Sequence, residues 1–303
     1  MSKALHSEAQ SGDDHLLVAQ AKTDNLLDRV NEQITLDTFN SNDQQLLKQL
    51  VECLGDTRGM TRLRAAETLG EIGEPTTPFL VEALAHHTNV VVRRAAAKTL
   101  TLIADPIAIP DLVHALLTDE DTVVTGSAAG ALARTGEAAV PELLKILESP
   151  EHSESIKGHV AWALAFIGSE AEEYLYKALS SDSNEVRAAV IAALTKVAQE
   201  KPEGGACTIL INALTDSAEI VRCEAAAVLG NLAHQPAVPH LVDLLDHESW
   251  ESRKSAALAL MKIGDRTAIE PLQSALAYES TEQVQKIIKL AISQLERQLD
   301  DED

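Results

Sequence analysis

The chain has 303 residues, of which 45% are hydrophobic and only 3% aromatic, so a substantial core must be built largely from aliphatic side chains. Its 25 Lys and Arg stand against 47 Asp and Glu, and the formal net charge of -22 argues against binding to nucleic acid and against docking on anionic membranes. The polar start MSKALHSEAQSGDD, the lack of an apolar run near roughly 18 residues, and three cysteines without a CxxC motif predict a cytoplasmic protein with free thiols and no membrane insertion.

The N-terminal residues lie outside any repeat. Residues 1–25 are polar and are predicted to be disordered, and residues 26–42 add at most one weak helix. The segment QQLLKQLVECLG, residues 44–55, is predicted to be a single helix that caps the array that follows it. The folded array is therefore expected to begin at residue 26.

An internal repeat runs through most of the remaining chain. Seven Ala-rich segments, from RLRAAETLGEIG (62–73) to RKSAALALMKIG (253–264), share a leucine that recurs every 30 to 35 residues. The shared leucines are Leu69, Leu100, Leu132, Leu164, Leu194, Leu229 and Leu260. Between these segments lies a second motif of the type PDLVHAL (110–116), whose proline suits the first turn of an amphipathic helix. Each repeat is thus a pair of short helices, which buries its apolar face by stacking on the next pair.

The predicted fold class is all-α, an α-solenoid or superhelix of about seven helix pairs over residues 26–276. The segment QEKPEGGA (199–206) lengthens one connection and accounts for the longest repeat. Residues 277–299 are predicted to contain a C-terminal capping helix, and residues 300–303 (DDED) an acidic tail in solvent.

The repeat pattern resembles that of a known family. Over roughly residues 43–276, the order P-x-L-x-x-L-L, an Asp-containing turn and V-R-x-x-A-A-x-x-L-G-x-I-G resembles HEAT-like repeats, and in particular the short, Ala-rich repeats of the cyanobacterial phycobilisome-lyase-type family. The resemblance implies a structural ladder between repeats, interrupted where Thr125 and Lys157 replace arginine. The ladder residues that it implies are Arg62, Arg93, Arg187, Arg222, Arg253, Asp56, Asp119 and Asp216.

Counting from each shared leucine predicts which side chains face water. The residue four positions before it is always small and apolar, which indicates the core, whereas the residues two before and two after are mixed and often charged. The last two positions lie on one stripe of the helix. The HEAT resemblance implies that this second helix lines the concave surface.

Trp162 and Phe166 occupy these two positions in the fourth of the seven repeats, so we expect them side by side on the concave face. An exposed aromatic pair in a groove has the composition of a binding hot spot. Packing of both rings in the core is the alternative. Tyr176 is predicted to lie in the core and Tyr174 at the surface. The other residues that we expect on the concave face are His159, Gly126, Gly130, Arg134, Gly158, Arg94 and Lys98.

Three glycines inside the second helices call for a reason, because each costs about 1 kcal/mol relative to alanine. Gly126, Gly130 and Gly158 allow either close packing between helices or room in the groove for a partner's side chain or a flat ligand. His159 is either a surface residue or a part of the groove. Cys223 is either a packed small residue or a thiol that contacts a cofactor carried by a partner.

The sequence contains no phosphate loop, no G-x-S-x-G, no H-E-x-x-H and no metal-ligand spacing, so catalysis is not favoured and no metal or intrinsic cofactor is expected. We expect a scaffold or adaptor that binds a protein on its concave face. The resemblance implies a phycobiliprotein or phycobilisome as partner, in a chaperone-like, assembly or degradation role. A bilin lyase subunit acting on a tetrapyrrole, and an adaptor for an A-type iron–sulfur scaffold protein, are the alternatives. In these cases the bilin or the iron–sulfur cluster is carried by the partner.

Overall fold

The structure is a computed structural model that describes residues 2–300 of the chain, and the side chains of residues 16–297. The residues it describes form helices joined by short turns and contain no strand, so the fold is an all-α solenoid of HEAT-like helix pairs. The chain divides into two compact units, one ending at Ala139 and one beginning at Val140.

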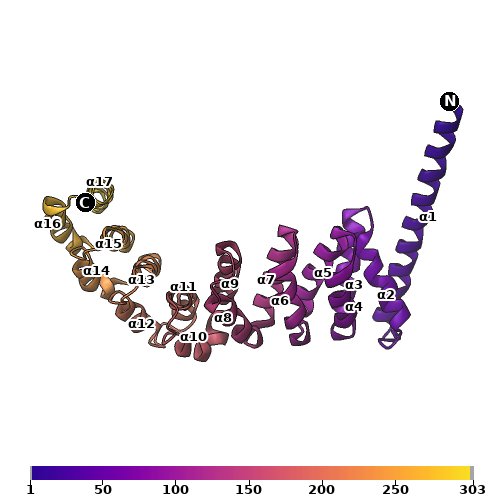
Figure 1. Cartoon of the computed structure of the whole chain (residues 1–303), viewed down its shortest axis with the longest axis horizontal. Helices are drawn as coiled ribbons and strands as arrows, with labels where there is room; N and C mark the ends of the chain where they lie inside the picture. Colours follow the sequence, from indigo (N-terminus) through magenta and orange to yellow (C-terminus); the bar gives the residue numbers. More distant parts are fainter. Residues whose placement is uncertain (1, 301–303) are drawn as a thin grey trace. The chain divides into compact units, whose positions relative to one another are not determined.

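The first unit contains seven of the labelled helices (Figure 1). They are α1 (Ser2–Thr35), α2 (Gln44–Glu52), α3 (Gly59–Ile72), α4 (Thr77–His86), α5 (Val90–Ile103), α6 (Ile109–Thr118) and α7 (Thr122–Thr135). In this unit α3, α5 and α7 are the second helices of their repeats.

The second unit continues the same alternation. Its helices are α8 (Val140–Glu148), α9 (Glu154–Ile167), α10 (Glu172–Ala178), α11 (Asn184–Glu200), α12 (Ala206–Ala213), α13 (Glu219–Asn231), α14 (Val238–Leu244), α15 (Trp250–Ile263), α16 (Ile269–Tyr278) and α17 (Glu282–Asp300). Within this unit, the odd-numbered second helices form one layer and the even-numbered first helices form the other (Figure 1).

The core follows the leucine register predicted from the sequence. All seven shared leucines are at most 1% exposed, and so are the small residues four positions before them. Those small residues are Ala65, Ala96, Ala128, Val160, Val190, Ala225 and Ala256. Small side chains at this position allow neighbouring second helices to approach closely. Gly230 shows how closely, because a Cβ atom added there would lie 2.9 Å from the Cα atom of Ala259 in α15.

The N-terminus differs from the expected disordered segment. Helix α1 spans Ser2–Thr35. It therefore covers all described residues of the segment 1–25, which the sequence predicts to be disordered, and part of 26–42, where the sequence predicts a weak helix. The stretch contains one glycine and no proline, so nothing in it breaks a helix. Leu27 and Val30 are fully buried and tie the helix to the array. The closing helix α17 lies within the predicted 277–299 segment apart from its last residue, and residues 301–303 of the acidic tail lie outside the described residues.

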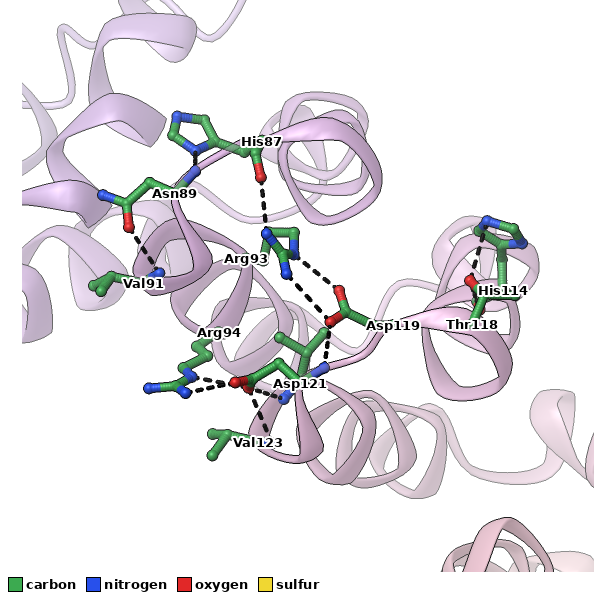
Figure 2. Close-up of polar contacts among 11 residues, drawn as sticks. His87, Asn89, Val91, Arg93, Arg94, His114, Thr118, Asp119, Asp121 and Val123 are labelled. Atoms are coloured by element: carbon green, nitrogen blue, oxygen red, sulfur yellow. Dashed lines mark hydrogen bonds and ion pairs between the residues drawn. The ribbon is translucent and has the colours of Figure 1, made fainter. Parts of the chain in front are cut away.

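The shared arginines close the turn before five of the second helices. In every case the guanidinium Nη1 donates to the carbonyl oxygen six residues earlier, as Arg93 does to His87 at 3.1 Å (Figure 2). The same bond is made by Arg62, Arg187, Arg222 and Arg253. Three of the five also pair with an acid in the next repeat: Arg93 with Asp119, Arg187 with Asp216, and Arg253 with Glu279.

The ladder departs from the sequence expectation at two arginines. Arg62 donates only to backbone carbonyls, and Asp56 pairs instead with Arg58, which also reaches Asp24 of α1. Arg222, only 6% exposed, donates to the hydroxyl of Ser252 in place of an acid. Arginine offers five N–H donors, so the turn is closed whether or not the inter-repeat partner is an acid.

Glu279 should make stability depend on pH. Its side chain is 3% exposed, and hydrogen bonds from Arg253 hold the pKa of this carboxyl at about 2, below the usual glutamate pKa of 4.5. Because the folded pKa lies below the unfolded one, the carboxylate stabilises the fold above about pH 4.5, and this stability is lost as the pH falls toward 2.

We therefore expect Glu279→Gln to lower the free energy of unfolding by about 2 kcal/mol at pH 7. The variant should also lose less stability than the parent between pH 5 and pH 2. Urea denaturation followed at several pH values checks both effects. Equal losses of stability on acidification in the two proteins would contradict this role of Glu279.

Candidate functional site

The candidate site lies on the layer of second helices in the second unit. We define its apolar row as the residues two positions before the shared leucine, which are Trp162, Ala192, Ala227, Leu258 and Leu290. In α17 the equivalent of the leucine is Ile292, because Gln285 donates to the carbonyl of Glu279 six residues earlier, just as the shared arginines do.

Two flanking rows lie one helical turn to either side of the apolar row. The first contains Gly158, Ala188, Cys223, Lys254 and Lys286, and the second contains Phe166, Lys196, Asn231, Lys262 and Gln294. Contacts across the layer confirm the alignment of the second row, since Lys196 of α11 reaches Phe166 of α9 and Lys262 of α15 donates to Asn231 of α13 at 2.7 Å. We call the three rows together the second-helix face.

Trp162 and Phe166 are both in contact with solvent. Their side chains are 53% and 40% exposed, and their ring centroids lie 5.7 Å apart with the planes tilted by 34°. Packing of both rings in the core, the alternative left open by the sequence, does not occur. Val160 and Leu164 of the same helix are fully buried, so α9 separates its core side chains from this exposed pair.

Lys196 holds the Phe166 ring in place. Its ammonium lies 5.0 Å from the centroid of that ring and donates to the Phe166 carbonyl oxygen at the end of α9. Cation–π attraction and the helix C-terminus both favour a positive charge there. Gly168, with a φ of 63°, makes the approach possible, because a Cβ atom at this residue would meet the Lys196 side chain at 2.5 Å.

Glu200 completes the contacts at this end of α9. It accepts hydrogen bonds from the hydroxyl and the amide of Ser169, and its carboxylate lies 3.7 Å from the Lys196 ammonium. The hydrogen bond from Ser169, followed by the charge of Lys196, lowers the pKa of Glu200. The aromatic pair is therefore anchored by the neighbouring repeat, so little side-chain freedom is lost when a partner binds.

His159 and Gly158 lie one turn before the pair. The half-buried His159 places Nδ1 2.9 Å from the carbonyl oxygen of Ser155, and because a carbonyl only accepts, Nδ1 carries the proton. Gly158 is exposed, and a Cβ atom there would have no neighbour within 4 Å. The same holds for Gly130 in α7. Close packing between helices thus does not explain these two glycines, and open space above the helix does.

Gly158→Ala separates stability from binding. With open space at the added methyl group, we expect the variant to raise the free energy of unfolding by about 0.5–1 kcal/mol, because alanine is the better helix former. If the space serves a partner, the same methyl group should weaken binding. Thermal denaturation and a binding titration on the same protein measure the two effects. A stabilised protein with unchanged affinity would show that the glycine leaves no needed room.

The remaining predicted concave residues belong to the first unit. Lys98 and Arg134 are exposed, and Gly126 is half-buried. Arg94 is engaged in an ion pair with Asp121, and its hydrogen bond lowers the pKa of that carboxyl to about 2 (Figure 2).

Three further side chains complete the comparison with the sequence. Tyr174 is 37% exposed, as predicted. Tyr176, which the sequence places in the core, is only half-buried, and its hydroxyl donates to the carbonyl of Gly204 in the long connection. The sequence shows that this connection is long, but it does not show that the connection folds back to give Tyr176 a hydrogen-bond acceptor. Cys223 is half-buried on the second-helix face.

The charge of this face is not evident from any single repeat of the sequence. The second unit contains 14 Lys and Arg against 27 Asp and Glu, yet the fifteen positions of the second-helix face include four lysines and no acid. The signal is present in the sequence, but it appears only when the register is extended to α17 and the rows are compared position by position.

The described part of the chain offers little chemistry of other kinds. No group of three or more His, Cys, Asp or Glu residues is placed there to hold a metal ion. None of the described helices combines the length and the apolar character needed to cross a membrane. The exposed aromatic pair and the lysines in the rows around it are therefore the features of this part of the chain that indicate a function.

Comparisons with known proteins agree with this architecture. Residues 47–133, 77–154, 140–204 and 207–293 match the HEAT-repeat family. The bilin biosynthesis protein MpeU of Synechococcus sp. (strain WH8020) is 38% identical over 256 residues, which cover 84% of this chain and 86% of that protein.

Two solved structures share the fold at low identity. Kap121p is 14% identical with a TM-score of 0.57, covering 88% of this chain and 35% of that one. Importin beta is 16% identical with a TM-score of 0.50, covering 82% of this chain and 41% of that one. At such identities the likeness concerns the helical solenoid alone.

Proposed function

We propose, from the premise that this chain belongs to the bilin lyase-type family of HEAT-repeat proteins, that it binds a phycobiliprotein through the second-helix face of its second unit. The observation that carries the proposal is the Trp162–Phe166 pair, which is exposed, is contacted by Lys196 and lies in three rows of residues that contain no acid. Rigid, half-exposed aromatic side chains are the residues that most often dominate protein interfaces.

The role we favour is that of a scaffold or adaptor acting on phycobiliproteins, in assembly, chaperoning or degradation. An exposed aromatic pair supports recognition of a protein surface. The net charge of -22 supports a partner that is neutral or locally basic where it meets the parts of this chain outside the second-helix face. The described side chains supply no set of acid, base and nucleophile in hydrogen-bonding contact on the second-helix face.

A bilin lyase subunit is the second candidate. It is favoured by the 38% identity to a bilin biosynthesis protein and by the open space above Gly158, next to aromatic rings on which a flat tetrapyrrole can stack. In this role the chain would help to transfer the bilin to the phycobiliprotein, and the bilin would be a substrate and not a permanently bound cofactor of this chain. The iron–sulfur scaffold alternative gains little support, since a single cysteine, Cys223, lies on the second-helix face.

One experiment tests the proposal and separates the two roles. The tagged chain is co-expressed with an apo-phycobiliprotein, with and without a bilin source, and purified on its tag. An adaptor should retain the phycobiliprotein in both cases without changing the amount of attached bilin. A lyase subunit should raise the covalently attached bilin, measured by absorbance of the denatured phycobiliprotein. If the chain neither retains the phycobiliprotein nor raises the amount of attached bilin, a role on phycobiliproteins is refuted.

A further inference from the structure

We infer that the segment bound on the second-helix face is an acidic amphipathic α-helix that lies across the second helices, along the apolar row. The inference rests on the proposed function, in that it takes this face to be the one that binds a protein. It adds the chemistry and the geometry of the bound segment.

The charge of the face selects an acidic segment. A chain with 47 acids among 303 residues places none of them in these three rows of the second unit, whereas it places Lys196, Lys254, Lys262 and Lys286 there. Two of these lysines contact uncharged groups, since Lys262 donates to Asn231 and Lys254 lies over the Trp250 ring at 5.8 Å. Lys196 and Lys286 are partly compensated by Glu200 and Glu282. A local positive charge in an acidic protein attracts carboxylates and rejects other basic surfaces.

The spacing of the apolar row selects a helix. Packed helices lie about 8–10 Å apart, so successive members of the row are separated by about that distance. Seven residues of an α-helix rise about 10.5 Å, so one apolar residue in every seven meets each member of the row in turn. An extended strand advances about 3.3 Å per residue, so the residue three positions further on lies about 10 Å away but points to the opposite side. A helix therefore keeps contact along the whole row, and a strand does not.

The lysines lie where a helix would carry its carboxylates. Lys254 and Lys286 flank the apolar row on one side, and Lys196 and Lys262 flank it on the other. Acidic residues three or four positions from the apolar ridge of an amphipathic helix project to both sides of that ridge. The bound helix therefore combines an apolar ridge with acidic flanks, which is the complement of this face.

The sizes of the row's side chains refine the match. The middle positions, Ala192 and Ala227, are small, whereas Trp162 at one end and Leu258 and Leu290 at the other are large. A bound helix can approach closely over the two alanines, so its largest apolar residues belong there and its smallest opposite Trp162.

A designed peptide tests the inference directly. The probe is a peptide of roughly 29 residues with one apolar residue in every seven, small opposite Trp162 and large over the two alanines, and with glutamates on both flanks. Its matched control carries lysines at the glutamate positions. Trp250→Phe leaves Trp162 as the single tryptophan and hence as the reporter. The acidic peptide should shift the Trp162 emission to shorter wavelength with an affinity that falls steeply with salt, and the basic peptide should bind at least about tenfold more weakly.

Lysine variants decide whether this face is responsible. Lys196→Glu with Lys262→Glu should weaken the acidic peptide about tenfold or more. The control, Lys145→Glu with Lys177→Glu, makes the same change of net charge on α8 and α10 of the other layer and should leave binding unchanged. Equal binding of the two peptides, or equal weakening by the two pairs of variants, would overturn the inference.

Binding of three different ligands distinguishes this inference from the proposed function. If an apo-phycobiliprotein binds the parent chain but the acidic peptide does not bind, the docking face stands and the acidic helix fails. If biliverdin alone shifts the Trp162 emission and the acidic peptide does not, the acidic helix likewise fails and the face is one for a flat anionic chromophore. If the peptide binds and the phycobiliprotein does not, the acidic helix stands and the identity of the partner fails.

Discussion

Replacing Trp162 and Phe166 together by alanine is expected to weaken phycobiliprotein binding by about 100-fold or more, which corresponds to about 2.7 kcal/mol. The two residues are 53% and 40% exposed and their rings lie side by side at one end of the second-helix face, so a bound partner would remove them from water. Aromatic side chains held in this way lose little entropy on binding.

The fold should tolerate the double variant. The rings contact each other and Lys196 and do not belong to the core, so we expect the free energy of unfolding to fall by less than about 1.5 kcal/mol. Titration calorimetry with the phycobiliprotein measures the affinity, and far-ultraviolet circular dichroism during urea denaturation measures the stability.

Tyr278→Ala provides the matched control. Tyr278 is 91% exposed at the end of α16, in the layer of first helices, so its removal deletes an exposed aromatic side chain outside the second-helix face. Unchanged affinity in the double variant, or an equal loss in Tyr278→Ala, would show that the Trp162–Phe166 pair does not carry the interaction.

The fold could be predicted from the sequence because the repeats can be aligned, so the buried positions of one helix can be checked against the equivalent positions of the others. One helix such as 157–168 leaves its buried face uncertain, but alignment on Leu164 with six similar helices assigns Val160 to the core and Trp162 to the surface. The same argument fails where the repeat ends. Helix α1 has no similar segment elsewhere in the chain with which it can be aligned. Its polar composition alone therefore predicts disorder where the structure has a helix.

The contacts between side chains of different repeats were less predictable than the register. Asp56 occupies the turn position of a ladder acid, but Arg58, two residues later in the same turn, takes the ion pair with its carboxylate. Likewise, Lys196 and Phe166 share the same repeat position, but their contact depends on the direction of a flexible side chain around Gly168. Sequence position fixes the row, and local geometry decides the partner.

Leu229→Ala is expected to lower the free energy of unfolding of the second unit by about 3–5 kcal/mol. Leu229 is fully buried in α13, between α11 and α15, and its loss leaves a cavity that neighbouring backbones cannot close. A Cβ atom added at Gly230 would lie 2.9 Å from the Cα atom of Ala259, so α13 and α15 are already closely packed beside Leu229. Because each repeat is stabilised by its neighbours, the cavity weakens two interfaces at once.

Ile220→Ala is the matched control, since it shortens an aliphatic side chain on the same helix at a position that is 53% exposed. It should cost less than about 1 kcal/mol. Urea denaturation of both variants, with hydrogen exchange of the α13 amides, distinguishes a local from a unit-wide loss. If Leu229→Ala cost no more than Ile220→Ala, the shared leucines would not form the core, and the assignment of Trp162 and Phe166 to the open face, which is counted from them, would fail as well.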